Sequence, residues 1–220
     1  MSLLVLFDVD GTLFLTHDPL FGQALIAAVE DVYGIRLADD ALDRSDHPGQ
    51  TTLKIIRELT GKEDRLEECC ARTAQRYVEL LEEADTSGWE AAPRARETLE
   101  ELKARAQIAL LTGNPEPVAR ARMERLGLRG IFSEGQGAFG CEREHRIDLI
   151  ALARARAGNH PPADTWTVGD TPTDISSAHA AGVRCVGVAS GRFDRSELEG
   201  ADLVIQRLDE LADAFSTLAP

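Results

Sequence analysis

The chain has 220 residues, enough for one sizeable hydrophobic core with a smaller attached unit. Its hydrophobic fraction of 43% and charged fraction of 28% are those of an ordinary soluble globular protein, and no apolar run reaches the length needed to span a bilayer. The formal net charge of −14 argues against nucleic acid or an anionic membrane as a partner, because either would be repelled.

The N-terminus and the cysteines both favour a reducing cytoplasm as the compartment. Residues 1–7 lack a basic lead-in and a small-residue cleavage site, so they predict a first strand and not a signal peptide. The four cysteines are scattered, two of them adjacent, and none has metal-ligand spacing. Since adjacent cysteines are poorly placed for an ordinary structural disulfide, we expect core packing to be the role of Cys69, Cys70, Cys141 and Cys185.

Short apolar runs typical of buried strands alternate with helix-like stretches along most of the chain. Prolines near its start and a glycine at its end mark one such helix over residues 115–126, and another helix follows Pro93. The alternation predicts βαβ units and therefore an α/β fold with a parallel sheet. The predicted strands cover residues 3–7, 108–111, 165–168, 183–188 and 202–205.

Residues from about 19 to 84 interrupt this alternation. The pair Asp18-Pro19 is typical of a helix start, and apolar residues recur at helical spacing after it. Further helices are indicated around residues 53–59 and 66–81, and the stretch has no strand pattern. We predict a helical insert between the first strand and the rest of the sheet.

Polar clusters follow three of the predicted strands. The first strand ends in Asp8-Val9-Asp10-Gly11-Thr12, and the second ends in Thr112-Gly113-Asn114. The third ends in Gly169-Asp170-Thr171-Pro172-Thr173-Asp174. Ligands of open parallel sheets bind outside the carboxyl ends of the strands. We therefore expect the three clusters to converge on one crevice.

Up to four carboxylates would crowd this crevice. Residues two apart in an extended segment point to the same side, so Asp8 and Asp10 can both face it, and Gly11 allows the sharp turn that keeps them together. With Asp170 and Asp174 added, the crowding requires protons or cations for neutrality. Oxygen ligands without His or Cys favour a hard cation such as Mg²⁺ over zinc. Such a cation would also allow an acidic protein to bind a phosphate.

The three clusters in this order resemble the motifs of the haloacid dehalogenase superfamily, in its phosphoglycolate-phosphatase-like branch with a helical cap of type C1. The resemblance extends over nearly the whole chain. It implies a three-layer Rossmann-like core with a parallel sheet, made of residues 1–15 and 87–220. Residues 16–86 would form a small α-helical cap domain inserted after the first strand.

The resemblance also implies roles for the residues of the clusters. In the first motif, residues 7–13, Asp8 would be the nucleophile and Asp10 the general acid and base. In the second motif, residues 111–114, the hydroxyl of Thr112 would hold a phosphoryl oxygen. The residues expected to bind phosphate are Thr112, Gly113, Asn114 and one arginine.

The fourth motif, residues 168–175, would supply metal ligands. Asp8 and Asp170 would bind Mg²⁺ directly, together with the main-chain carbonyl of Asp10, and Asp174 would bind it directly or through water. The third motif requires a Lys or Arg at the start of the preceding helix, and no lysine is available there. Arg146 fits this position best, and Arg143 is the alternative.

The predicted activity is hydrolysis of a small phosphate monoester through an aspartyl-phosphate intermediate. A cap that closes over the site favours a small phosphorylated metabolite as the substrate. The loop from Arg44 to Thr52 leads into a helix start, so we expect Arg44, Gln50 and Thr51 to contribute to specificity. An ordinary capped helix start with solvated side chains is the alternative. The assembly would be a monomer or a homodimer.

Three other functions remain open from the sequence. A sugar-phosphate mutase of the same superfamily would place a histidine about where Leu20 stands. A phosphonate hydrolase would need a cap lysine, for which only Lys54 and Lys62 are available. A phospho-accepting regulatory module also uses an aspartate, a threonine and a cation at strand ends, but it would be about half as long and would lack the helical insert.

Overall fold

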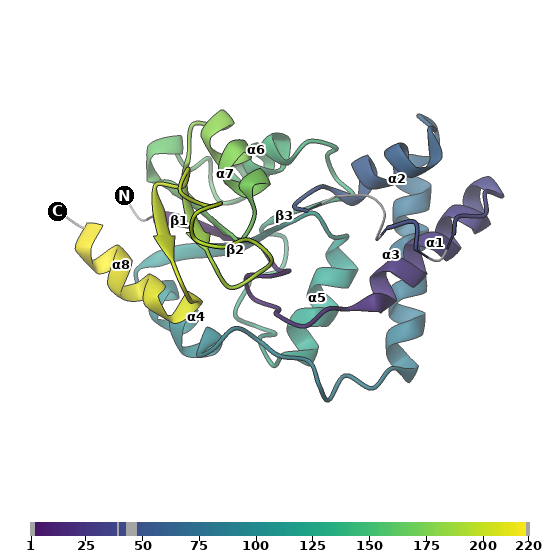
Figure 1. Ribbon diagram of the computed structural model, residues 1–220. Coiled ribbons are helices and arrows are strands. Elements are labelled where there is room, and N and C mark those ends of the chain that lie inside the picture. Colours follow the sequence, from purple (N-terminus) through teal and green to yellow (C-terminus); the bar gives the residue numbers. More distant parts are fainter. Residues whose placement is uncertain (1–2, 39, 43–47, 219–220) are drawn as a thin grey trace.

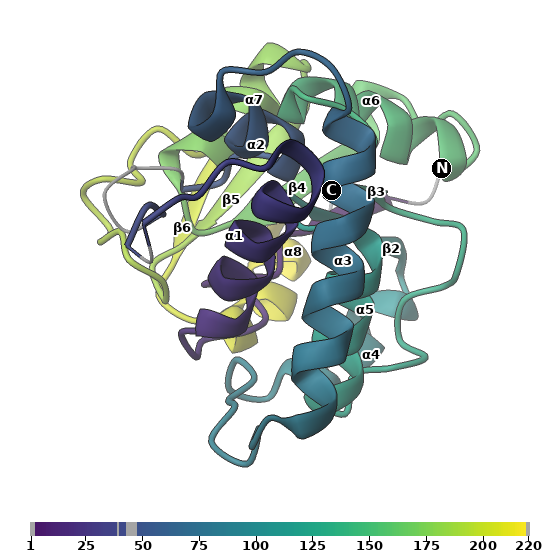
Figure 2. The same ribbon diagram turned by 90° about the vertical axis from the view of Figure 1, so that its right-hand side faces the viewer.

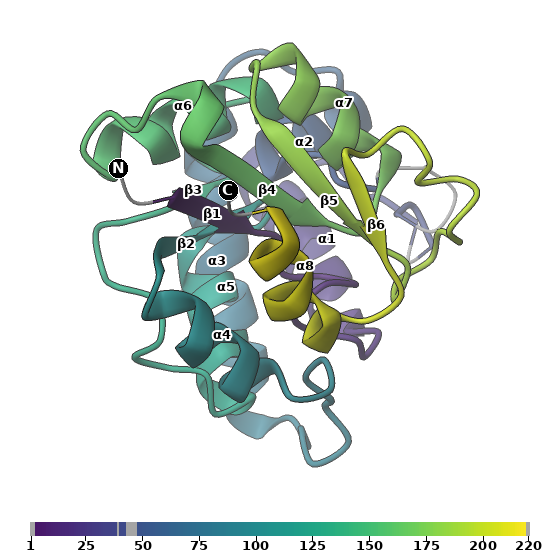
Figure 3. The same cartoon turned by 90° about the vertical axis from the view of Figure 1, so that its left-hand side faces the viewer.

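The computed structural model describes residues 3–38, 40–42 and 48–218, and its centre is a parallel sheet with strand order β3-β2-β1-β4-β5-β6. Every adjacent pair of strands runs parallel, with Val5 of β1 opposite Ile108 of β2 and Trp166 of β4. Figure 3 shows the strands side by side. They are β1 (Leu3–Phe7), β2 (Ala106–Thr112), β3 (Ala138–Phe139), β4 (Thr165–Gly169), β5 (Arg184–Val188) and β6 (Leu203–Ile205).

Helices cover both faces of the sheet, which confirms the predicted three-layer α/β core (Figure 1). Side chains alternate along β1, so Val5 and Phe7 pack against one helical layer while Leu4 and Leu6 pack against the other. The first layer contains α4 (Ala95–Lys103), α5 (Glu116–Arg125) and α8 (Leu211–Leu218). The second layer contains α6 (Arg146–Arg156) and α7 (Pro172–Ala180).

All five predicted strands are present, the first with the predicted ends and the other four with shifted ends, and one strand was not predicted. The strand β2 begins at Ala106, two residues before the apolar run that indicated it. The strand β3 has only two residues, Ala138 and Phe139, which pair with Leu111 and Thr112. A run this short carries no periodic pattern, so the sequence could not reveal it.

The segment 16–86, called the helical segment below, contains α1 (Pro19–Tyr33), α2 (Thr52–Thr60) and α3 (Leu66–Glu83). Its described part contains no strand. The helices α1 and α3 lie side by side (Figure 2), and buried Leu25, Ile56 and Cys69 belong to a hydrophobic cluster of their own. Asp18 begins α1 as its N-cap, because its carboxylate accepts a hydrogen bond of 2.9 Å from the amide of Leu20.

The two connections between the helical segment and the sheet run beside each other. The amide of Leu15 donates to the carbonyl of Glu90 at 3.0 Å, and the amide of Glu90 donates to the hydroxyl of Thr16 at 2.8 Å. The segment therefore leaves and rejoins the sheet at one place. None of the described helices is both long and apolar enough to cross a membrane.

A disulfide joins Cys70 of α3 to Cys141, which follows β3, with 5.8 Å between the Cα atoms. The expectation that all four cysteines only fill the core was therefore wrong for these two. Adjacent residues on a helix point about 100° apart, so Cys70 can face Cys141 while Cys69 faces the interior. Cys69 and Cys185 are free and buried, as expected.

Candidate active site

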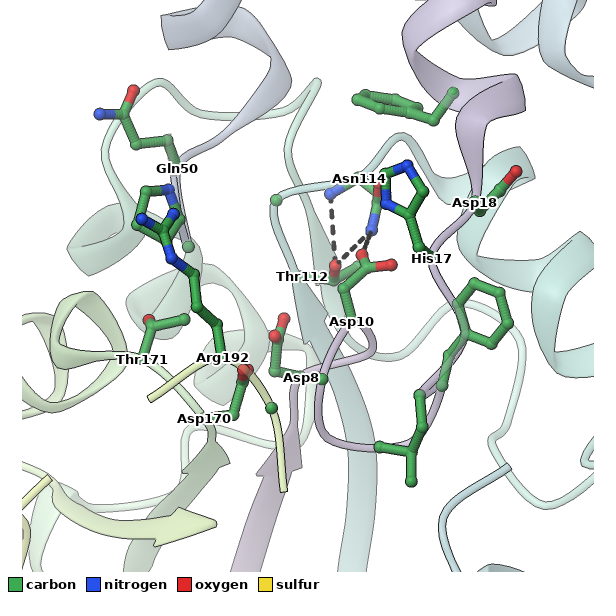
Figure 4. Close-up of a pocket in the computed structure, with 18 of the residues that line it drawn as sticks. Asp8, Asp10, His17, Asp18, Gln50, Thr112, Asn114, Asp170, Thr171 and Arg192 are labelled. Carbon is green, nitrogen blue, oxygen red and sulfur yellow. Dashed lines mark hydrogen bonds between the residues drawn. The ribbon is translucent and has the colours of Figure 1, made fainter. Parts of the chain in front are cut away.

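A cavity of about 590 Å³ lies at the carboxyl ends of the strands. Strand order reverses between β1 and β4, and this is where open α/β sheets bind ligands. The loop after β1 contributes Asp8 and Asp10, the end of β2 contributes Thr112, and the loop after β4 contributes Asp170 (Figure 4). The three clusters predicted to converge do line one cavity.

Asp8 is the first residue after β1, and only 5% of it is exposed. Its amide donates to the carbonyl of Val168 at 2.9 Å, which fixes the main chain at the end of the sheet. Burial raises the pKa of Asp8 to about 7; the charge of Arg146 lowers it in part, and the charges of Asp174 and Asp10 raise it further. A carboxylate in this position needs a cation or a proton beside it.

Asp8, Asp170 and Asp174 form a buried cluster in which one oxygen from each residue lies within 4.8 Å of the others. Burial also raises the pKa of Asp170 to about 8, and the neighbouring negative charges of Asp8 and Asp174 raise it further. Three carboxylate oxygens at this spacing fit a hard divalent cation. The side chain of Asp10 is not part of this cluster.

Asp174 is held rigidly in place by the start of α7. Its carboxylate accepts hydrogen bonds from the amide and the hydroxyl of Thr171, at 3.0 and 2.7 Å, while its own amide donates back to that hydroxyl. This capping box occupies Oδ2. The other oxygen, Oδ1, lies 2.5 Å from Nη2 of Arg146.

The last residue of β2 and the loop after it supply polar groups to the cavity that Asp8 lines. The buried hydroxyl of Thr112 accepts hydrogen bonds from the main-chain amide and the side-chain Nδ2 of Asn114, at 3.3 and 3.0 Å (Figure 4). The same Nδ2 donates to Asp10. A Cβ atom at Gly113 would collide with the carbonyl of Gln50, so the glycine is what lets the helical segment approach this loop.

The structure separates the two arginines considered for the third motif. Arg146 is the first residue of α6 and is buried, and its Nη2 lies 3.0 Å from Asp8 and donates to the carbonyl of Leu111 at 3.1 Å. Arg143 is exposed and donates to the carbonyl of Glu142. The geometry therefore favours Arg146.

The residues expected to govern specificity are placed differently. Gln50 lines the cavity, whereas Thr51 does not. The hydroxyl of Thr51 accepts a hydrogen bond from the amide of Lys54, so it caps α2. The same hydroxyl donates to the carbonyl of Glu144 at 2.6 Å, which attaches the start of α2 to the loop between β3 and α6. Thr51 therefore leaves the set of specificity candidates. Arg44 lies outside the described residues.

Sequence analysis missed several residues that line the cavity. Ser190, Gly191, Arg192 and Phe193 follow β5, and the polar residues after a strand end are the signal that had revealed the other clusters. His17, between β1 and α1, also lines the cavity (Figure 4).

Arg122 was also missed, although it reaches Asp10 from α5. Its neighbours in the pattern of α5 are the buried Val118, Ala119 and Met123. An arginine among buried helical positions is therefore the signal that could have found it.

The site is thus that of an α/β enzyme with an acidic, cation-fitting centre at the strand ends. Residues 5–188 match the family model described as haloacid dehalogenase-like hydrolase. The chain is 30% identical over 217 residues to the phosphoglycolate phosphatase of Chromobacterium violaceum, covering 95% of this chain and 94% of that protein. The chain therefore belongs to the haloacid dehalogenase-like hydrolase family.

Solved structures show the same fold. The crystal structure of a predicted phosphatase from Clostridium acetobutylicum matches with a TM-score of 0.70 at 20% identity, over 99% of both chains. The structure of CbbY from Rhodobacter sphaeroides in complex with phosphate matches with a TM-score of 0.70 at 22% identity, over 96% of both chains. The family model and the phosphoglycolate phosphatase relative confirm the superfamily read from the sequence motifs, while the type of cap stays a prediction.

Proposed function

We propose that the protein is a Mg²⁺-dependent phosphatase that hydrolyses a small phosphate monoester through an aspartyl-phosphate on Asp8. The observation that carries this proposal is the buried carboxylate of Asp8 at the base of a cavity, between the guanidinium of Arg146 and the carboxylate of Asp170. Thr112 and Asn114 line the same cavity. The relationship to a phosphoglycolate phosphatase supports the same reaction class.

The chemistry requires two displacements at phosphorus. An oxygen of Asp8 forms a bond to phosphorus while the ester P–O bond breaks, and Asp10 gives its proton to the leaving oxygen. Asp10 then takes a proton from a water molecule as that water attacks the phosphorus, which releases phosphate and restores Asp8. Arg146 and Thr112 are placed to balance charge on the phosphoryl oxygens.

Mg²⁺ would be held by Asp8, Asp170 and Asp174, with the main-chain carbonyl of Asp10. When bound, it would neutralise the carboxylates and the phosphoryl group. The raised pKa values of Asp8 and Asp170 support this assignment, because groups that resist ionisation beside each other are those that a cation stabilises.

The helical segment is proposed as a cap that closes over the site, which favours a small phosphorylated metabolite over a phosphoprotein. Gln50 and His17 line the cavity from this segment, so they are placed to contact the part of the substrate beyond its phosphate. Arg44 remains a candidate from the sequence alone. We further propose that the enzyme works in the cytoplasm as a monomer or homodimer, without nucleic acid or membrane partners.

No specific observation among the described residues favours the alternative functions from the same superfamily. Leu20, at the position where a sugar-phosphate mutase would have its histidine, belongs to the apolar contacts of the helical segment. A phosphonate hydrolase needs a lysine in the site, and no lysine occurs among the described residues that line the cavity. A phospho-accepting module would give a stable phosphoprotein in place of turnover.

Release of inorganic phosphate tests the proposed function. Wild type should turn over p-nitrophenyl phosphate and some members of a panel of small phosphate esters, including 2-phosphoglycolate, only with Mg²⁺ present. Asp8→Asn should lower kcat by ~10³-fold or more, because an amide cannot form the intermediate. Near-normal turnover by a folded Asp8→Asn protein would show that the covalent mechanism is wrong.

A further inference from the structure

The guanidinium of Arg122, on α5, is buried at the boundary between the helices that cover the sheet and the helical segment. Only 3% of the side chain is exposed. The rings of Phe14, Phe21 and Tyr77 surround it, with their centroids 5.3, 5.8 and 5.4 Å from Cζ. A charge so far from water must be paired to be tolerated, so its partners indicate what it does.

Arg122 joins Asp10 to two residues of the helical segment. Its Nη1 donates to both carboxylate oxygens of Asp10, at 2.7 and 2.9 Å. Its Nε and Nη2 donate to Oδ2 of Asp18 at 3.1 and 2.9 Å, and Nε also donates to the hydroxyl of Tyr77 at 3.2 Å. The hydroxyl of Tyr77 in turn donates to Asp18 at 2.7 Å. One side chain thus connects the loop after β1 with α1 and α3.

Asp10 differs from the other members of this network in its exposure. Half of its side chain is accessible, whereas the side chain of Asp18 is only 2% exposed. Asp10 lines the cavity, and Nδ2 of Asn114 donates to it from the other side (Figure 4). Arg122 and Asn114 therefore fix the carboxylate while leaving part of it open to the cavity.

We propose that Arg122 is a positioning residue for Asp10, and that its bonds to Asp18 and Tyr77 couple the orientation of Asp10 to the docked helical segment. The inference rests on the proposed function, because it presupposes that Asp10 protonates the leaving oxygen. A proton donor must lie within hydrogen-bond reach of its acceptor, and small misplacements are costly. Arg122 would lose two of its three anchors if the helical segment moved away, so Asp10 is fully held only in the docked state.

Dependence on the leaving group distinguishes this role from a purely structural one. An alkyl phosphate needs its leaving oxygen protonated, whereas p-nitrophenolate leaves readily without a proton. Arg122→Gln should lower kcat for the best alkyl phosphate of the wild type by ~10- to 100-fold, and for p-nitrophenyl phosphate by less than about threefold. Equal losses on both esters would overturn the inference while leaving the proposed phosphatase activity intact. A wild type that hydrolyses no phosphate ester would refute the proposed function and the inference together.

A double-mutant cycle provides a second measurement. If Arg122 acts through Asp10, adding Arg122→Gln to Asp10→Asn should lower kcat for the alkyl ester by less than about threefold more. Full additivity would contradict the inference. If Arg122→Gln does not fold, Arg122→Lys keeps the buried charge but loses the planar fork, and Tyr77→Phe removes the hydrogen bonds of the hydroxyl to Arg122 and Asp18. Both variants should then show the same selective loss on the alkyl ester, to a smaller degree.

Arg125→Gln is the matched control. Arg125 lies on the same helix, and its Nη2 donates to the carbonyl of Leu81 in α3 at 3.3 Å. The variant therefore disturbs the same boundary without removing a bond to Asp10. It should leave the ratio of the two ester rates at the wild-type value. A change in this ratio equal to that of Arg122→Gln would show that loosening the boundary is sufficient, and the positioning role would be wrong.

Discussion

Nη2 of Arg146 lies 3.0 Å from Oδ1 of Asp8, and both side chains are buried at the base of the cavity. The contact connects the first residue of α6 with the first residue after β1. Removing one member of such a pair leaves the other buried without its counter-charge. The position of Arg146 beside Asp8 therefore leads to a prediction about activity.

Arg146→Ala should lower kcat by roughly 10²- to 10³-fold, because a preorganised positive group beside the transferring phosphoryl is lost. Arg146→Lys should recover part of the rate, since the charge returns without the planar fork, whose Nη2 lies beside Asp8 and Asp174 while its Nη1 donates to the carbonyl of Gly49. Phosphate release from p-nitrophenyl phosphate at saturating Mg²⁺ is the measurement, with thermal melting to confirm folding.

Arg143→Ala is the control for this prediction. Arg143 is exposed and, within the described part of the chain, bonds only the neighbouring carbonyl of Glu142, so its removal should change kcat by less than about twofold. The opposite ranking of the two variants would mean that Arg143 fills the third-motif role.

Mg²⁺ should stabilise the protein more at alkaline than at acidic pH. The pKa of Asp8 is raised from 3.8 to about 7 and that of Asp170 from 3.8 to about 8, in both cases chiefly by burial. Between pH 3.8 and the raised pKa values, Asp8 and Asp170 of the folded metal-free protein keep protons that they have lost in the unfolded chain. The contribution of these two groups to the free energy of unfolding is therefore largest below pH 3.8. It is lost as the pH rises through the folded-state pKa values of about 7 and about 8.

Mg²⁺ competes with those protons, so the increase in Tm that it causes should be larger at about pH 8.5 than at about pH 6. Comparing each pH with and without Mg²⁺ removes the contributions of other titrating groups. Asp170→Asn should lose most of the Mg²⁺-dependent increase, because one buried ligand is gone. An equal increase in Tm at both pH values would contradict the assignment of Asp8 and Asp170 as ligands.

The sequence was sufficient for the parts of the site that lie directly after strands. Asp8, Thr112 and Asp170 each follow an apolar run, and parallel strands bring such positions to one edge. The sequence favoured Arg146 over Arg143 by its position along the chain alone, whereas the structural distinction depends on which residue begins α6 and turns inward. A hydrophobic pattern does not show at which residue a helix begins, and so it does not show which side chain of the first turn points inward.

Two further features depend on contacts between distant parts of the chain. Burial of Arg122 requires Asp10, Asp18 and Tyr77 together, and no local pattern in α5 names these partners. The disulfide between Cys70 and Cys141 spans 71 residues and requires that α3 dock beside the end of β3. The partner of Cys70 is therefore set by the tertiary structure and not by the residues next to it in the chain.

Reduction of this disulfide should lower the free energy of unfolding. Closing a loop of 71 residues restricts the unfolded chain, so we expect a loss of about 2–4 kcal/mol on reduction. Urea denaturation with and without dithiothreitol measures the difference. The matter bears on the proposed cytoplasmic location, because thiol reductants there keep most protein disulfides open.

Thiol counting and two variants serve as controls for the disulfide. Oxidised, denatured protein should contain two free thiols, from Cys69 and Cys185. Burial raises the pKa of both thiols to about 12, so exchange with the disulfide in the folded protein should be slow. Cys70→Ser should make stability independent of dithiothreitol, whereas Cys185→Ala should keep the dependence. Four free thiols in air-oxidised protein would show that the bond does not form.

Gln50→Ala should change the ranking among phosphate esters more than it changes the chemistry. Gln50 reaches the cavity from the helical segment, whereas the proposed role of Asp10 concerns the ester oxygen that every substrate has. We expect shifts of about 3- to 10-fold in kcat/KM that differ between esters for Gln50→Ala, and losses on every alkyl ester for Asp10→Ala. Gln75→Ala is the matched control, because Gln75 is exposed on α3 and its side chain bonds, among the residues that the structure describes, only Arg72 and Glu79. Kinetic constants for several esters decide the matter. A uniform loss across esters for Gln50→Ala would mean that the loop supports docking on Gly113 without contacting the substrate, and no loss at all would remove Gln50 from the specificity residues.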